Sequence, residues 1–166
     1  MADREQAYKG LSLTANGFGF LGSLVEFEPP EVKEMTESYR GGRAAPIKVM
    51  VGYEEVEAKF KLSRDDANIA ALRAIVGRDV VMTVRASADE KGKTIETRFD
   101  IYGRIYTVET AAIKAGAMVE KTYTVAVEKF VKSIDGVPVE AFDLEIGEFK
   151  LGSTDVLADV KAQIGL

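Results

Sequence analysis

The residues best suited to chemistry in this sequence are carboxylates, grouped at Glu54, Glu55 and Glu57 and again at Asp65 and Asp66. Paired carboxylates hydrolyse glycosidic bonds, and carboxylate oxygens bind hard cations. A second interpretation gives these carboxylates a structural role without catalysis or metal binding. Glu55 and Glu57 fall on the solvated side of a predicted strand, and Asp65 and Asp66 stand at a predicted helix N-terminus, where negative charge is favourable. We therefore expect these carboxylates to be structural.

Other residue types that commonly take part in catalysis are few in this sequence. The 166 residues include no histidine and no cysteine, which excludes Ser–His and Cys–His pairs, disulfides and thiolate metal sites. Gly17 with Gly19 and Gly41 with Gly42 are the candidates for a phosphate-binding loop, but neither pair follows a buried parallel strand and opens a helix. We expect a protein that is not an enzyme, with no cofactor and no metal.

Composition indicates one globular domain over residues 1–166, because hydrophobic residues make up 46% of the chain and charged residues 30%. The net charge of −5 argues against general binding to phosphate backbones, yet an acidic wall would let DNA slide past it. No apolar run approaches the ~18 residues that span a bilayer, and the start lacks a signal-peptide pattern. We expect synthesis in the cytoplasm.

The elements that must position these residues are mostly strands. Asn16-Gly17 predicts a hairpin turn between a strand at 11–15 and a return strand from Phe18 to about Phe27, which Pro29-Pro30 ends. Apolar residues then alternate over 47–53 and, in the opposite parity, over 56–62, so a bulge is expected near Glu54-Glu55. Further strands are expected at 79–88, 94–108, from Tyr123 to a turn at Asp135-Gly136, at 138–144 and near Phe149.

One helix is expected between these strands. Ser63 and Asp66 form a capping box, Ile69, Leu72, Ile75 and Val76 recur at helical spacing, and Gly77 stands where a C-cap belongs. A small helix is also expected from Asp155 to about Gln163. The fold class is therefore mainly β, with two packed antiparallel sheets (a sandwich or small barrel) and one flanking helix.

A segment of about residues 28–46 fits none of these elements. It is polar, proline-punctuated and too long for an ordinary turn, and such a segment usually serves a partner. Tyr and Arg are favoured interface anchors. We expect Tyr39, Arg40 and Arg43 to anchor this arm on another subunit, and Gly41 and Gly42 to let its tip turn.

In the order of its motifs, the chain resembles the major tail tube proteins of contractile-tailed bacteriophages and of R-type pyocins. The resemblance covers roughly Leu11 to Leu166. It rests on Glu37-Ser38-Tyr39-Arg40-Gly41-Gly42 followed by Ala45-Pro46, on Gly52-Tyr53-Glu54 with Val56-Glu57-Ala58-Lys59-Phe60, on Tyr123-Thr124-Val125-Ala126-Val127, on Asp135-Gly136 and Phe142-Asp143, and on Ile164-Gly165-Leu166.

The resemblance implies a structural subunit that forms hexameric rings, which stack into a hollow tube conducting DNA or penetrating the target cell envelope. The arm at 28–46 would bridge neighbouring subunits and rings. Implied partners are the sheath, the tail initiator or baseplate, the terminator and the tape-measure protein, with DNA only in passage and a membrane only on penetration. The implied location is the virion tail or a phage tail-like particle.

The chain also departs from the family pattern. Pro29-Pro30-Glu31-Val32 stands where the family usually has a single proline followed by a basic and an apolar residue. Arg43 replaces an apolar residue near the arm tip, so a charge-assisted contact is expected there in place of an apolar insertion.

Three questions stay open at this point. Glu55, Glu57, Lys59 and Lys61 alternate on one strand face and are candidates for the lumen of the tube, although an outer, sheath-facing surface has the same pattern. The tube could belong to a non-phage contractile injection system. In a different class, a small β-barrel ligand-binding module could use a pocket lined by Phe18, Phe20, Phe99 and Tyr102.

Overall fold

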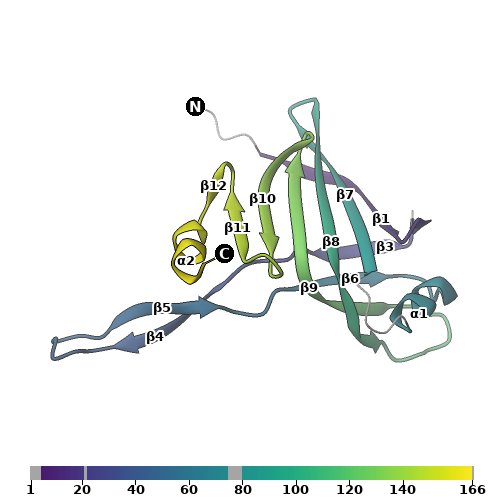
Figure 1. Cartoon of the computed structure of the whole chain (residues 1–166). Helices are drawn as coiled ribbons and strands as arrows, with labels where there is room; N and C mark the ends of the chain where they lie inside the picture. Colours follow the sequence, from purple (N-terminus) through teal and green to yellow (C-terminus); the bar gives the residue numbers. More distant parts are fainter. Residues whose placement is uncertain (1–4, 21, 75–79, 166) are drawn as a thin grey trace.

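A computed structural model describes residues 5–20, 22–74 and 80–165, and most of them lie in antiparallel strands (Figure 1). The elements in chain order are β1 (Ala7–Ala15), β2 (Phe18–Gly19), β3 (Leu24–Glu28), β4 (Glu34–Tyr39), β5 (Ile47–Tyr53), β6 (Glu57–Leu62), α1 (Ala67–Arg73), β7 (Val80–Glu90), β8 (Lys93–Thr110), β9 (Lys121–Ile134), β10 (Val137–Asp143), β11 (Glu148–Leu151), β12 (Thr154–Asp155) and α2 (Ala158–Ile164).

The main sheet has the strand order β12-β11-β10-β9-β8-β7-β1-β2, and every pairing in it is antiparallel. The first half of β9 also pairs with β6, which in turn pairs with β3. The sheet therefore bends over itself, and β3 and β6 cross beneath the long strands without closing a barrel (Figure 1). β4 and β5 form a separate two-stranded sheet.

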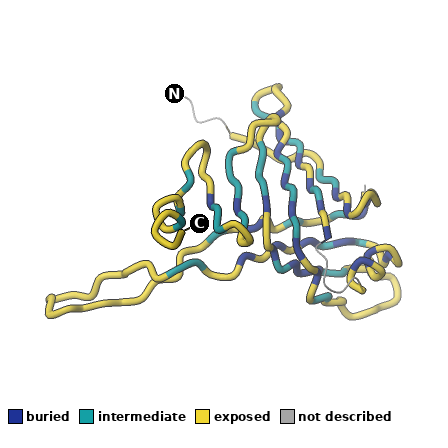
Figure 2. The backbone as a smooth tube through the Cα atoms, in the orientation of Figure 1, coloured by how far each residue is buried: buried dark blue, intermediate teal, exposed yellow. Residues whose placement is uncertain are grey.

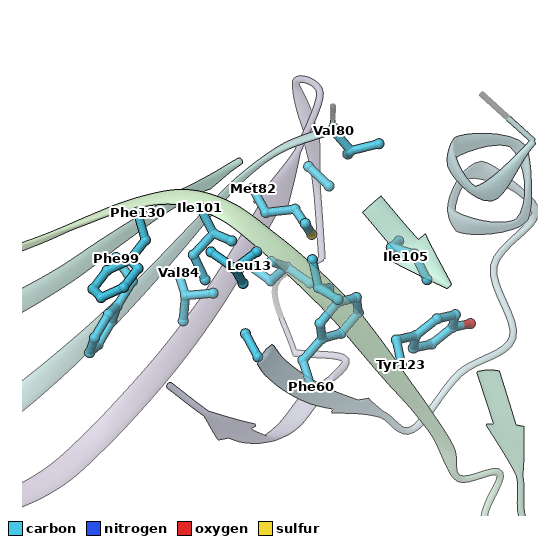
Figure 3. Close-up of a cluster of buried hydrophobic side chains, with 14 of the residues drawn as sticks. Leu13, Phe60, Val80, Met82, Val84, Phe99, Ile101, Ile105, Tyr123 and Phe130 are labelled. Atoms are coloured by element: carbon cyan, nitrogen blue, oxygen red, sulfur yellow. The ribbon is translucent and has the colours of Figure 1, made fainter. Parts of the chain in front are cut away.

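The core lies between the long strands and the layer formed by β3 and β6 (Figure 3). On β8, Ile95, Thr97, Phe99, Ile101 and Ile105 are all buried, which confirms the predicted one-sided alternation. Ring contacts join the two layers, including Phe27 against Phe99 at a centroid distance of 5.3 Å. The predicted mainly β class, with two packed antiparallel layers, is confirmed.

β8 and β9 approach each other closely at Gly103, where the register shifts between Tyr102 and Gly103. A Cβ built on Gly103 would lie 2.1 Å from the backbone oxygen of Ala126. No real side chain fits at that separation, so glycine is required here to keep the two longest strands paired across the bulge.

The predicted turns at Asn16-Gly17 and Asp135-Gly136 are confirmed, since all four residues have positive φ between 45° and 84°. The expected return strand from Phe18 to Phe27 is wrong as one element. β2 ends at Gly19 and β3 begins at Leu24. The Phe20 N–H still donates to the Leu13 carbonyl and its ring enters the core, but the Phe20 carbonyl then accepts from the Ser23 N–H at 3.2 Å in a turn that separates the two strands. Pairing does end before Pro29, as expected.

The N-cap of α1 is Asp66, not Ser63 as the capping box predicted. The Asp66 carboxylate accepts from the backbone N–H of Asn68 at 2.8 Å, and Arg64 also contacts it. Ile69 and Leu72 are buried as expected, whereas Ile75, Val76 and Gly77 lie outside the described residues. In the described chain, neither helix is long and apolar enough to cross a bilayer.

Candidate functional site

The most unusual feature is the hairpin of β4 and β5, which projects away from the body of the molecule (Figure 1). Its strands pair from Glu34 opposite Tyr53 to Tyr39 opposite Ile47. All of β4 and the first five residues of β5 are exposed, and Figure 2 shows the hairpin as a continuous exposed extension. Its exposed apolar side chains are Met35, Tyr39, Ile47, Val49, Met50 and Val51. A hairpin of two strands alone is marginal in water, so this one is suited to being covered by a partner.

The base of the hairpin is fixed to the body. The Glu54 N–H donates to the Lys33 carbonyl at 2.8 Å, and the Tyr53 ring packs edge-on against Phe149 at 5.7 Å. Val32 packs against the core cluster. The hairpin therefore leaves the body in a defined direction.

The tip is shaped by Tyr39, Arg40, Gly41, Gly42 and Arg43. The Arg40 side chain donates to the carbonyls of Arg43 at 3.0 Å and Ala44 at 3.4 Å, which folds the tip around its guanidinium. Gly41 and Gly42 have φ of 50° and 76°, a conformation that favours glycine. The tip is thus a compact turn with two arginines and an exposed tyrosine.

The sequence predicted a new strand from Ile47, directly after the arm, and among the described strands this strand, β5, pairs with β4 alone. The predicted arm at 28–46 overlaps β4 and the tip, and the projecting hairpin continues through β5. Near Glu54-Glu55, where a register change or bulge is expected, the strand is interrupted: β5 ends at Tyr53 in the hairpin and β6 begins at Glu57 in the main sheet.

The outer face of β6 is polar, as its alternation predicts. Glu55, Glu57 and Lys59 are exposed, and Lys61 is half-buried with its Nζ 3.8 Å from Glu26 and from Glu120. Tyr106 donates its hydroxyl hydrogen bond to Glu57, and this bond to a carboxylate raises the pKa of Tyr106. Glu55, Glu57 and Lys59 also line a hollow of about 470 Å³ near the base of the hairpin.

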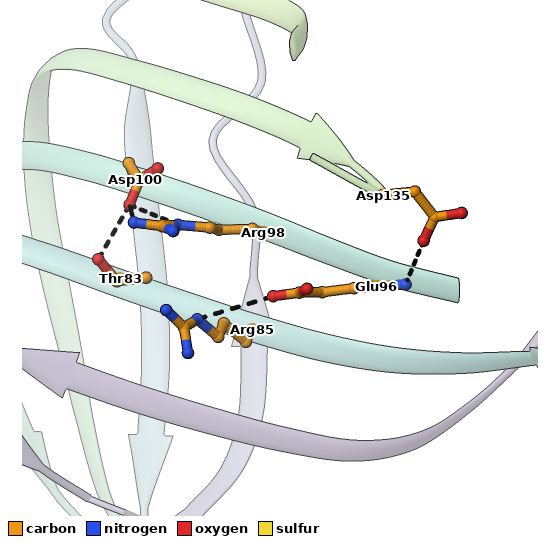
Figure 4. Close-up of polar contacts among 6 residues, drawn as sticks. All are labelled: Thr83, Arg85, Glu96, Arg98, Asp100 and Asp135. Carbon is orange, nitrogen blue, oxygen red and sulfur yellow. Dashed lines mark hydrogen bonds and ion pairs between the residues drawn. The ribbon is translucent and has the colours of Figure 1, made fainter. Parts of the chain in front are cut away.

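A second polar face, which the sequence reasoning did not single out, covers the outside of β7 and β8 (Figure 4). Asp100 accepts from Arg98 Nε at 3.0 Å and from Thr83 at 2.9 Å. Arg85 lies 3.7 Å from Glu96. The alternation of Glu96, Arg98 and Asp100 was visible in the sequence. Arg98 and Asp100 pair within β8, whereas the pair of Glu96 with Arg85 depends on the register with β7.

The carboxylates that could have done chemistry are not gathered into a site. Asp66 caps α1, and Asp65 pairs with Lys121 at 2.7 Å, holding the pKa of Lys121 above its usual value. Glu54 stands at the hairpin base. Among the described residues, no group of three or more acidic side chains is arranged to hold a metal ion.

The aromatic residues of the alternative ligand pocket do not converge. Phe20 and Phe99 are buried in the core, whereas Phe18 is exposed. Tyr102 lies on the outer face of β8, with Lys129 Nζ 5.6 Å from its ring centroid. These four side chains therefore do not form one binding site.

A β-rich body with an exposed apolar hairpin is typical of a structural subunit that assembles with other subunits. The family model described as phage tail tube protein FII matches residues 5–165, nearly the whole sequence. The chain therefore belongs to the phage tail tube family, which makes it a structural protein of viral tails. A search among curated proteins found no match to this chain.

Proposed function

We propose that copies of this protein close into hexameric rings, and that the rings stack into the hollow tube of a contractile tail. The tube would conduct DNA or penetrate the target cell envelope, and the protein would have no catalytic role and no cofactor. The observation that carries this proposal is the exposed β4–β5 hairpin in a chain of the tail tube family.

The hairpin supplies the free energy for contacts between copies. Burying one large apolar side chain is worth about 1.5–3 kcal/mol, so covering several of those on the hairpin stabilises a contact substantially. A head-to-tail contact of this kind forms a ring when its rotation closes. Tyr39, Arg40 and Arg43 would be the anchors of the arm, with Gly41 and Gly42 setting its turn.

The edge of the main sheet supports assembly as well. Within the described residues, β1 pairs with β2 only at Thr14 and Ala15, whereas its pairing with β7 runs from Ala7 to Ala15. The backbone groups along the remaining edge can accept a strand from another copy, which would remove an aggregation-prone edge.

The wall of the bore would be a polar sheet face. From the alternation of charges, Glu55 just before β6 and Glu57, Lys59 and Lys61 on β6 are the proposed lining. The outer face of β7 and β8 is the second candidate, because its Arg and Asp side chains are already paired with each other and would bind passing phosphates weakly.

The proposed partners are those of a contractile tail: the sheath around the tube, the initiator or baseplate at one end, the terminator at the other, and the tape-measure protein. DNA would be met only in passage and a membrane only on penetration. The protein would be synthesised in the cytoplasm of the host bacterium before it joins the tail.

Sedimentation velocity on the purified protein tests the proposal. We expect an 18.1 kDa monomer at low concentration and large particles above a critical concentration. A single monomeric species at every concentration, also in the presence of the tail initiator, would contradict it.

A further inference from the structure

A second exposed apolar surface lies on the loop between β8 and β9, residues 111–120. Ile113 is 95% exposed and Met118 is 81% exposed, unusual values for side chains of this kind. The loop borders a hollow of about 380 Å³ whose lining is mainly apolar and also includes Asp65, Glu120, Lys114 and Lys121. This volume is within the range of sites that enclose a small ligand, so it can accept an aromatic ring.

The hollow and the hairpin tip lie at opposite ends of the molecule. In Figure 1 the hairpin extends to the left, whereas α1 and the end of β8 lie at the far right. β4 alone, with six residues at about 3.3 Å per residue, spans about 20 Å. The tip therefore cannot reach the hollow of its own chain. In a head-to-tail contact, however, the tip of one copy faces the opposite end of the next.

The tip is positively charged, and the hollow offers two exposed carboxylates. The tip carries Arg40 and Arg43, and in the described part of the chain no hydrogen bond or ion pair engages the Arg43 guanidinium. At the hollow, the carboxylates are the outward groups: the side chain of Asp65 is 67% exposed, whereas that of its partner Lys121 is 18% exposed.

The same arrangement holds at Glu120. Its side chain is 55% exposed, whereas that of its partner Lys61 is 29% exposed. In both ion pairs the carboxylate is therefore the more exposed partner and can bind an arginine, while the exposed Lys114 also lines the hollow.

We propose that the hairpin tip docks on the 111–120 loop of a neighbouring copy. The Tyr39 ring covers Ile113 and Met118, and the arginines of the tip contact Asp65 and Glu120. The contact is heterologous, because it joins two different surfaces: the tip of one copy and the hollow of the next. Every copy offers one of each, so the same contact can repeat from copy to copy. This inference rests on the proposed function, because it requires copies of the chain to assemble.

Cross-linking tests the contact directly, because the chain has no cysteine of its own. One preparation carries Arg43→Cys and a second carries Met118→Cys, and the two are mixed, assembled and oxidised. We expect a disulfide-linked dimer containing one chain of each kind. The matched control replaces Met118→Cys with Val137→Cys, an exposed position at the start of β10, and should give no such dimer.

Charge reversal provides a second measurement if the cysteine variants assemble poorly. Arg43→Glu should raise the critical concentration for assembly about fivefold, which corresponds to the largest interaction free energies of exposed ion pairs. Glu120→Arg in the same chain should restore the original critical concentration.

The outcomes separate the two proposals. Tubes without the dimer, and without rescue by Glu120→Arg, overturn the docking site and leave the tube subunit intact. A wild-type chain that forms no tubes overturns both.

Discussion

The ring of Tyr39 lies directly over the backbone of Gly41: a Cβ at Gly41 would be 2.6 Å from Tyr39 Cε1. The adjacent Gly42 has the same left-handed backbone, but a Cβ there would have no atom within 4 Å. Comparing alanine substitutions at the two glycines therefore separates the effect of backbone strain from the effect of displacing the Tyr39 ring.

Gly41→Ala should impair assembly more than Gly42→Ala. Both alanines adopt an unfavourable φ, but only the first also pushes the Tyr39 ring from its position. Turbidity or pelleting of tubes measures the difference, with circular dichroism to verify that both variants fold. Equal loss in the two variants would mean that the position of Tyr39 is unimportant.

Shortening the hairpin should abolish assembly and leave the fold intact. Thr36 and Met50 are register partners, so replacing residues 37–49 by Asn-Gly closes a short hairpin in their place. Because the removed residues are exposed, the free energy of unfolding of the body should change by no more than about 0.5 kcal/mol. Urea denaturation and pelleting measure the two effects. An unchanged tube yield would refute the assignment of the arm.

Gly103→Ala should destabilise the body by about 1–3 kcal/mol, because the new methyl group meets the Ala126 backbone and not a movable side chain. Gly19→Ala is the matched control, since its Cβ would have nothing within 4 Å. The midpoints of urea denaturation compare the two. If both variants lose the same stability, the close approach of β8 and β9 does not restrict position 103.

Labelling of introduced cysteines distinguishes the two candidates for the bore. In assembled tubes, Lys59→Cys should be protected from a maleimide attached to a large polymer, whereas Arg85→Cys should react. Both should react with a small maleimide, which enters the bore, and both should react with the large reagent as monomers. The reverse labelling pattern in tubes would indicate that the outer face of β7 and β8, and not β6, lines the bore.

Acid should weaken the capping of α1. Hydrogen bonds from the Asn68 N–H and then from Arg64 hold the pKa of Asp66 below its ordinary value of 3.8. The ionised carboxylate therefore contributes its full stability above that value and loses it as the pH falls through the lower, folded-state pKa. Asp66→Asn keeps a cap acceptor without the charge.

The difference in unfolding free energy between the native chain and Asp66→Asn should shrink as the pH falls below 3.8. Asp89 and Asp155 also have lowered pKa values, but they are common to both proteins and cancel in the comparison. Urea denaturation over a pH series measures the difference. A difference that is constant with pH would show that the charge of Asp66 contributes nothing.

Local chemistry explains which parts of the fold the sequence predicted. The turns at Asn16-Gly17 and Asp135-Gly136 depend on residues that tolerate positive φ, and the buried side of β8 follows from its alternation. The N-cap was misplaced by three residues because Ser63 and Asp66 are both good capping residues. Only the tertiary position of the chain decides between them.

The hairpin was missed for a different reason. Ile47, Val49 and Val51 are spaced two residues apart, as apolar residues of a body strand are, yet all three are exposed. The last helix gives a similar result. Val156, Leu157, Val160 and Ile164 were expected on one side of it, but Val160 and Ile164 of α2 and the preceding Val156 are exposed, and of the four Leu157 packs against the core. A surface that is buried against another copy is apolar, as a core is. The pattern of apolar residues in one sequence therefore cannot distinguish a subunit interface from a core.

Negative-stain electron microscopy of the purified protein above its critical concentration decides whether copies of this chain build a tube. We expect stacked rings that form hollow tubes of uniform width, absent from the variant with the shortened hairpin. Dispersed single subunits under the same conditions, with or without the tail initiator, would show that the chain is not a tube subunit.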